Sequence, residues 1–134
     1  MKNLVRLDAA AIIKAVLISI VAGIVIGGMT GFMGFGVGVA GILTDDMVKT
    51  SIILQGFLFC LGQLPNFIAG YFAAAFAGRN ELMHGVVVGA VLLAIEGLFY
   101  LVPDEAPFTL LNGFSLLLSV PVAVAGSVVC RRTQ

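Results

Sequence analysis

Four long apolar runs, separated by short charged segments, constrain the fold of this chain more than any other feature. The runs are residues 15–44, 50–78, 82–102 and 106–130; none of them contains Asp, Lys or Arg, and only the third contains a glutamate. A helix needs about 20 apolar residues to cross about 30 Å of hydrocarbon. The chain is therefore predicted to form one integral membrane domain, residues 1–134, with four transmembrane helices in a bundle. The predicted spans are approximately 10–32, 50–78, 82–102 and 107–130.

The composition supports an all-α membrane fold and excludes several classes of protein. The 134 residues are 60% hydrophobic and only 10% charged, whereas soluble domains average about 25% charged residues. Such a chain has too little polar surface to face water all round, so the lipid bilayer is its first expected partner. The formal net charge is zero, which gives no reason to expect a nucleic-acid partner. The length leaves no room for a separate soluble catalytic domain.

The positions of Lys and Arg predict the orientation of the chain in the membrane. If the N-terminus is cytoplasmic, only Lys49 falls in an outer loop, beside Asp45 and Asp46. Cytoplasmic segments of membrane proteins carry an excess of basic residues. Both termini are therefore predicted to be cytoplasmic. The residues then on the inner side are Lys2, Arg6, Lys14, Arg79, Arg131 and Arg132.

Two of the predicted spans contain features that disturb a regular helix. The segment Gly31–Gly41 is rich in glycine, which lowers helix propensity by up to about 1 kcal/mol per residue relative to alanine. We expect the first helix to end near residue 32, with the tail a frayed helix, a bent helix or a re-entrant segment. In the second span Pro65 predicts a kink. Gln63 and Asn66 flank this proline, and their amides could bond the freed carbonyl or a neighbouring helix.

The two halves of the sequence echo each other weakly. Each half has an apolar span, an acidic outer loop and a span in which proline is followed five residues later by glycine. The two pairs are Pro65 with Gly70 and Pro121 with Gly126. This pattern suggests two helix hairpins in parallel orientation, like the parallel repeats of some transporters.

Small residues four positions apart form the clearest local pattern. In lipid, helices associate through close packing and interhelical hydrogen bonds, and small residues let their backbones approach. We expect these ridges to pack helices together, either within one chain or between chains. The second case predicts a homo-oligomer or a larger membrane complex. The candidate packing residues are Gly23, Gly27, Gly31, Gly70, Ala74, Gly78, Gly85 and Gly89.

Glu96 is the only acidic residue well inside a predicted span. An intramembrane acid is costly and is by default a functional hypothesis. Glu96 could take up and release a proton during transport. Alternatively it is protonated, or hydrogen-bonded by side chains of neighbouring helices such as Gln55, Thr109, Asn112 or Ser115, and we favour this second interpretation. The candidate polar path consists of Glu96, Gln63, Asn66, Gln55 and Asn112.

His84 lies one turn into the third predicted span. Asn80 is a candidate N-cap, and Glu81 suits the positive end of the helix dipole. The histidine could sense cytosolic pH, but we favour an interfacial residue with its ring turned toward lipid headgroups or the turn. One histidine and two distant cysteines provide no metal-ligand cluster by spacing. We also find no nucleophile–base pair, and we expect no cofactor and no enzymatic activity.

The central stretch resembles a pattern found in small four-span bacterial membrane proteins of unknown function. In that pattern a helix rich in Gly and Ala ends in an Ala-Gly-Arg turn, here Ala77-Gly78-Arg79, and His84-Gly85 opens a glycine-spaced helix that includes Gly89. The matching residues are about 69–89. The resemblance implies a four-helix fold in a bacterial inner membrane and implies no activity.

Two functions remain open. The first is a non-enzymatic structural or accessory membrane protein that packs through its small-residue ridges. The second is an oligomeric, proton-coupled small transporter or channel that uses Glu96. Transport requires the polar residues to surround a water-accessible cavity. If side chains of the same chain enclose Glu96 instead, transport loses its best candidate residue.

Overall fold

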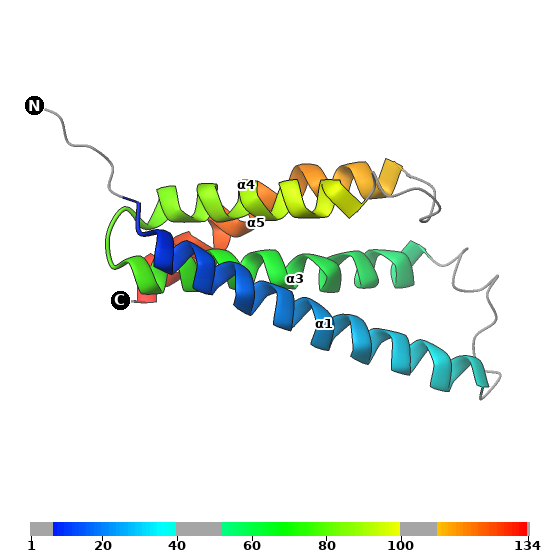
Figure 1. Cartoon of the computed structure of the whole chain (residues 1–134). Coiled ribbons are helices and arrows are strands. Elements are labelled where there is room, and N and C mark those ends of the chain that lie inside the picture. Colours follow the sequence, from blue (N-terminus) through cyan, green and yellow to red (C-terminus); the bar gives the residue numbers. More distant parts are fainter. Residues whose placement is uncertain (1–6, 40–51, 100–109, 134) are drawn as a thin grey trace, which may run out of the picture.

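The computed structural model describes residues 7–39, 52–99 and 110–133, and these residues form four helices. They are α1 (Ala9–Val39), α3 (Ile52–Ala77), α4 (Glu81–Phe99) and α5 (Leu110–Thr133), as Figure 1 shows. Each helix is long and apolar enough to cross a membrane. The prediction of an all-helical bundle with four such helices is therefore confirmed.

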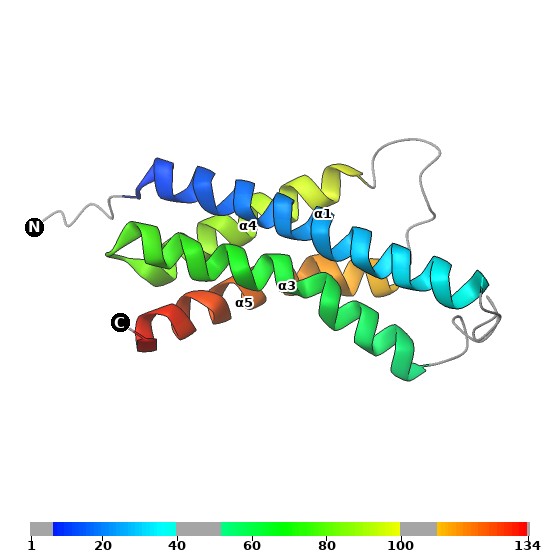
Figure 2. The same ribbon diagram turned by 90° about the horizontal axis from the view of Figure 1, so that it is seen from below.

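The helices run along a common direction, so that three chain segments meet at one end of the bundle. The start of α1, the turn between α3 and α4 and the end of α5 all lie on the left in Figure 1. At this end Figure 2 shows α3 between α1 and α5. All the lysines and arginines of the described residues belong to this end, namely Lys14, Arg79, Arg131 and Arg132.

The glycine content suggested that the first helix would end near residue 32, but it does not end there. It continues through the glycine-rich segment to Val39, and residues 40 and 41 lie outside the described residues. Helix propensity is a weak preference that context overrides. In hydrocarbon an unpaired backbone group costs several kcal/mol, so a helix that bonds all its own amides is favoured even in a glycine-rich sequence.

A tight turn joins α3 to α4. Gly78 has φ of 60° and its N–H donates to the Ala74 carbonyl at 3.2 Å, which is the usual way for glycine to end a helix. Nothing lies within 4 Å of a Cβ added at Gly78, so this glycine ends α3 and does not contact another helix. Asn80 has φ of 50°, and its carbonyl accepts the His84 N–H at 3.1 Å, so it stands at the predicted N-cap.

The most extensive contact between two helices is the crossing of α3 and α5, where two backbones touch. A Cβ added at Gly70 of α3 would overlap the Ala123 carbonyl of α5, and one added at Gly126 would overlap the Phe67 carbonyl. The two contacts are equivalent. In each helix the glycine lies five residues after the proline, and the residue whose carbonyl is contacted lies two residues after it. Ser127 Oγ also donates to the Gly70 carbonyl at 3.0 Å. Both helices continue through their prolines.

The helix α4 packs on α5 through two further glycines. A Cβ at Gly85 would overlap the Ser127 side chain, and one at Gly89 would lie 2.8 Å from the Cα of Val120. Ala123, which lies close to both glycines, is fully buried. α3 and α4 therefore both pack closely on α5 at glycines, and the three helices form one unit.

The helix α1 lies against this unit mainly through α3. Ala15 is fully buried in one cluster with Ala69 and Ala73, and Ser19 Oγ donates to the Pro65 carbonyl at 3.0 Å. Of the predicted packing glycines of α1, a Cβ added at Gly23 would lie 3.8 Å from Pro65 Cγ, an ordinary contact, while one added at Gly27 would meet nothing within 4 Å. Gly31 belongs to the helix, but its packing lies outside what the structure describes.

Candidate functional site

Three helices bring polar side chains together around Glu96. Its Oε1 accepts a hydrogen bond from Asn66 Nδ2 of α3 at 3.1 Å, and its Oε2 accepts one from Ser119 Oγ of α5 at 2.7 Å. Asn66 Nδ2 also lies 3.3 Å from Ser119 Oγ. The glutamate is thus hydrogen-bonded by one side chain from each of the two neighbouring helices.

Two more side chains extend this cluster along α3 and α5. Gln63 Oε1 accepts from Asn66 Nδ2 at 3.4 Å, and Gln63 Nε2 donates to Ser115 Oγ at 2.6 Å. Helical spacing explains the arrangement, since residues three or four apart lie on one face. We call these five residues, Gln63, Asn66, Glu96, Ser115 and Ser119, the polar cluster.

Burial differs sharply across the polar cluster. Asn66 is 2% exposed, Ser119 is fully buried and Gln63 is 8% exposed, while Glu96 is half-buried. Glu96 is the one titratable side chain of the five, and both its oxygens act as acceptors. The cluster can therefore hold three helices in register, and it can bind a proton at the carboxylate.

The predicted polar path is partly assembled in the polar cluster. Glu96, Gln63 and Asn66 meet there, and the amides of Gln63 and Asn66 bond side chains of neighbouring helices. Gln55 lies two turns before Gln63 on α3, and Asn112 lies in the first turn of α5; each has an interaction of its own. Thr109, considered as a partner of Glu96, lies outside the described residues.

Ser119 is the residue that sequence reasoning missed. It donates the shortest hydrogen bond to Glu96, at 2.7 Å. Two signals could have identified it. It lies four residues after Ser115, on the same helix face, and it precedes Pro121 by two residues, just as Gln63 precedes Pro65.

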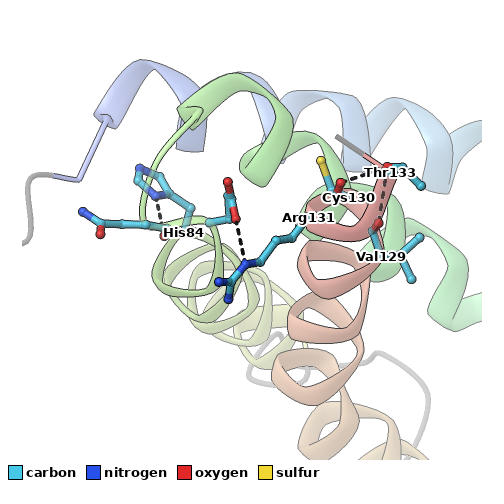
Figure 3. Close-up of polar contacts among 7 residues, drawn as sticks. His84, Val129, Cys130, Arg131 and Thr133 are labelled. Carbon is cyan, nitrogen blue, oxygen red and sulfur yellow. Dashed lines mark hydrogen bonds and ion pairs between the residues drawn. The ribbon is translucent and has the colours of Figure 1, made fainter.

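A second polar site lies at the end of the bundle where α1 begins. His84 is fully buried, its Nε2 lies 2.8 Å from the Asp8 backbone N, and its Nδ1 lies 3.1 Å from the Asn80 carbonyl oxygen. Figure 3 shows the bond to Asn80. The ring is therefore turned toward the turn, and an orientation toward headgroups is excluded because no part of the side chain is exposed. Asp8 was not anticipated as a partner.

An ion pair beside this site joins α4 to α5. Arg131 Nε lies 3.7 Å from Glu81 Oε2, with the arginine side chain 66% exposed, and Figure 3 shows the two side chains meeting. They border an open depression of about 410 Å³ that Asn80, Leu82 and Met83 complete. Exposed pairs of this kind contribute about 0–1 kcal/mol, so the pair adds little to the helix contact.

Comparisons with protein-family models, with curated proteins and with solved structures find no match for this chain. Among the residues of the four helices and the α3–α4 turn, no three His, Cys, Asp or Glu side chains come together. The site is therefore interpreted from its own geometry.

Proposed function

We propose that this chain is a non-enzymatic structural or accessory protein of a bacterial inner membrane, associated with itself or with a larger membrane complex. The observation that carries the proposal is the hydrogen bonding of the Glu96 carboxylate within the chain. Both carboxylate oxygens accept hydrogen bonds from side chains of the same chain, one on α3 and one on α5. In this proposal the polar cluster is an interhelical lock.

Energetics favour a lock over an open transport path. An acidic side chain at mid-membrane costs about 2.5–3.5 kcal/mol on insertion scales. Interhelical hydrogen bonds in membrane proteins contribute about 0.6–2 kcal/mol each. The two bonds to Glu96 therefore offset much of its cost, and they do so only when α3, α4 and α5 are docked. The carboxylate then specifies how the three helices are rotated against each other.

Burial also supports the absence of catalysis. Ser119 and Glu96 form a hydroxyl–carboxylate pair at 2.7 Å, which by distance alone resembles a nucleophile and its base. Ser119 is fully buried between helices, and a nucleophile must be reached by its substrate. The pair therefore fits a structural role.

The proposed orientation places both termini in the cytoplasm. Its support is the grouping of Lys14, Arg79, Arg131 and Arg132 at the end of the bundle where α1 starts and α5 ends. Basic residues near the ends of membrane helices favour the cytoplasmic side. The bacterial inner membrane itself rests on the resemblance of residues 69–89.

Native purification tests the accessory role. The intact protein is extracted in a mild detergent or a lipid-retaining polymer and analysed by native mass spectrometry. We expect a homo-oligomer or a stoichiometric complex with another membrane protein. A monomer without a partner under conditions that preserve known membrane complexes would contradict this part of the proposal.

A second candidate, an oligomeric proton-coupled transporter or channel, is favoured by one observation: Glu96 is half-buried while Asn66 and Ser119 are enclosed. Proton flux into liposomes under a pH gradient separates the two candidates. We expect wild type and Glu96→Gln to show the same flux as liposomes without protein. A flux present in wild type and lost in Glu96→Gln would replace the structural role with transport.

A further inference from the structure

His84, the single histidine of the chain, lies in the first turn of α4 and joins it to the segment before α1, which holds no residue of the polar cluster. Its Nε2 faces the backbone N of Asp8, just before α1, and its Nδ1 faces the Asn80 carbonyl oxygen, just before α4. The imidazole is fully buried. Each ring nitrogen therefore has a backbone hydrogen-bond partner, and neither needs a water molecule as a partner.

The two partners fix the protonation state of the ring. A backbone N–H can only donate, so Nε2 must offer its lone pair to Asp8. The Asn80 carbonyl can only accept, so Nδ1 must carry the proton. The arrangement accommodates neutral imidazole with its proton on Nδ1. A proton added to Nε2 would point an N–H at the Asp8 N–H, and the bond between them would be lost.

The hydrogen bond between His84 and Asp8 also affects α1, because Asp8 caps that helix. Its Oδ1 accepts the N–H groups of Ala10 at 2.9 Å and Ala11 at 3.2 Å, which makes it the N-cap of the helix. The residue that caps α1 is thus the residue held by the imidazole. Because α1 packs mainly on α3 and only slightly on α4, this hydrogen bond is an important tie between the starts of α1 and α4.

The charged groups at this end of the bundle belong to α1 and the residue before it, to the α3–α4 turn, to α4 and to α5. Lys14 of α1 lies over the Phe76 ring at 5.8 Å, and Glu81 of α4 is paired with Arg131 of α5. The Asp8 carboxylate belongs to the segment that the ring already holds, and an imidazolium would attract it. The other titratable side chains of these elements are Arg79 in the turn, Cys60 and Tyr71 of α3, Glu96 of α4, and Cys130 and Arg132 of α5.

We propose that His84 is a proton-operated latch for the first turn of α1. The neutral ring holds the Asp8 N–H and keeps the start of α1 against α4. When Nε2 takes a proton from water, the ring becomes a cation, the Asp8 N–H loses its acceptor and the start of α1 is released. The rest of α1 stays in place, because Ser19 and Ala15 attach it to α3 independently. This latch is independent of the function proposed for the polar cluster.

Imidazole ¹⁵N spectroscopy tests the starting state without any mutation. The full chain in lipid nanodiscs is labelled with ¹⁵N-histidine, and its single ring gives one unambiguous pair of signals. At pH 8 we expect a protonated Nδ1 and an unprotonated Nε2, the less common tautomer of free histidine. A ring protonated on Nε2 at pH 8 would overturn the latch.

Amide hydrogen exchange then tests the release, with rates corrected for the intrinsic effect of pH. The pH is lowered in steps while the ring signals are followed. As the ring signals show protonation, the protection of the Asp8 amide should fall on the order of tenfold, the equivalent of one ordinary hydrogen bond. The amide of Val88, in the buried part of α4, should not change. Unchanged Asp8 protection with a protonated ring would overturn the proposal.

Two variants separate the ring bond from a simple charge effect. His84→Gln places an amide oxygen where Nε2 stands and cannot be protonated, so Asp8 protection should become independent of pH. Asp8→Asn keeps the cap and the backbone N–H but removes the carboxylate, so the loss of protection on ring protonation should remain. If Asp8→Asn abolishes that loss, attraction between imidazolium and carboxylate drives the change and the latch is wrong. If His84→Gln does not fold, the wild-type measurements still decide.

Discussion

The α3–α4–α5 unit and α1 are held together by different means. In the unit, backbones touch at Gly70 and Gly126, and hydrogen bonds between side chains connect all three helices at Glu96. α1 instead attaches by the apolar cluster around Ala15, by the hydrogen bond from Ser19 to α3 and by the bond from the Asp8 N–H to His84. Its outer face exposes large apolar side chains, including Leu17 at 56% and Ile24 at 69%.

The difference shows what a glycine contributes to the packing of an apolar helix. Gly70 and Gly27 both belong to small-residue ridges in the sequence, yet one touches a backbone and the other has nothing within 4 Å of an added Cβ. In lipid, apolar surface is not driven together, so a ridge matters only where another helix approaches it. The spacing of glycines therefore indicates where contact is possible and does not show which contacts form.

The largest expected effect comes from filling the α3–α5 crossing. Gly70→Ala would force the two backbones apart, because its Cβ overlaps the Ala123 carbonyl. Overpacking costs typically about 1–3 kcal/mol and occasionally more, and contact with backbone should put this variant at or above the upper end. Reversible unfolding in mixed detergent micelles measures the loss.

Gly62→Ala is the matched control for Gly70→Ala. It makes the same chemical change on the same helix, where nothing lies within 4 Å of the new Cβ. It should be neutral or stabilising by about 0.5–1 kcal/mol through helix propensity. Equal stability losses in the two variants would remove the distinction between touching and open glycines.

Asn66→Ala should have the next largest effect. Asn66 is 2% exposed and donates toward Glu96 Oε1, so its loss leaves a carboxylate oxygen without its partner. Leaving a buried acceptor unsatisfied costs about 1–3 kcal/mol. The same unfolding assay should show a larger loss for Asn66→Ala than for Leu64→Ala, a neighbouring change at a residue 41% exposed. The reverse order would exclude the polar cluster as an interhelical lock.

The smallest effect is expected at the attachment of α1. Ser19→Ala removes the hydrogen bond to the Pro65 carbonyl, and interhelical hydrogen bonds of this kind average about 0.6 kcal/mol. Hydrogen exchange of α1 should rise while exchange in α4 and α5 stays constant.

Thr30→Val is the control on the same helix. Thr30 Oγ1 bonds only carbonyls of its own helix, those of Ile26 and Gly27, so its loss should leave α1 exchange unchanged. If Ser19→Ala raises exchange throughout α3, α4 and α5, then α1 is not a separately attached helix.

The sequence alone predicted the four long helices of the described residues, their approximate positions and the candidacy of Glu96, because hydrocarbon requires long apolar segments and makes an acidic residue within one conspicuous. It also singled out Gln63 and Asn66, whose amides could bond either the carbonyl freed by Pro65 or a neighbouring helix. The predicted end of α1 near residue 32 is wrong, because the low helix propensity of glycine counts for less than the need of backbone amides to pair within an apolar environment. Tertiary structure alone decided that Ser119 completes the Glu96 site, that Asp8 faces His84 and that Gly70 touches a backbone while Gly27 does not. These outcomes depend on which helix faces meet. Because lipid solvates every apolar face almost equally, the hydropathy of the sequence does not show which faces pack against each other.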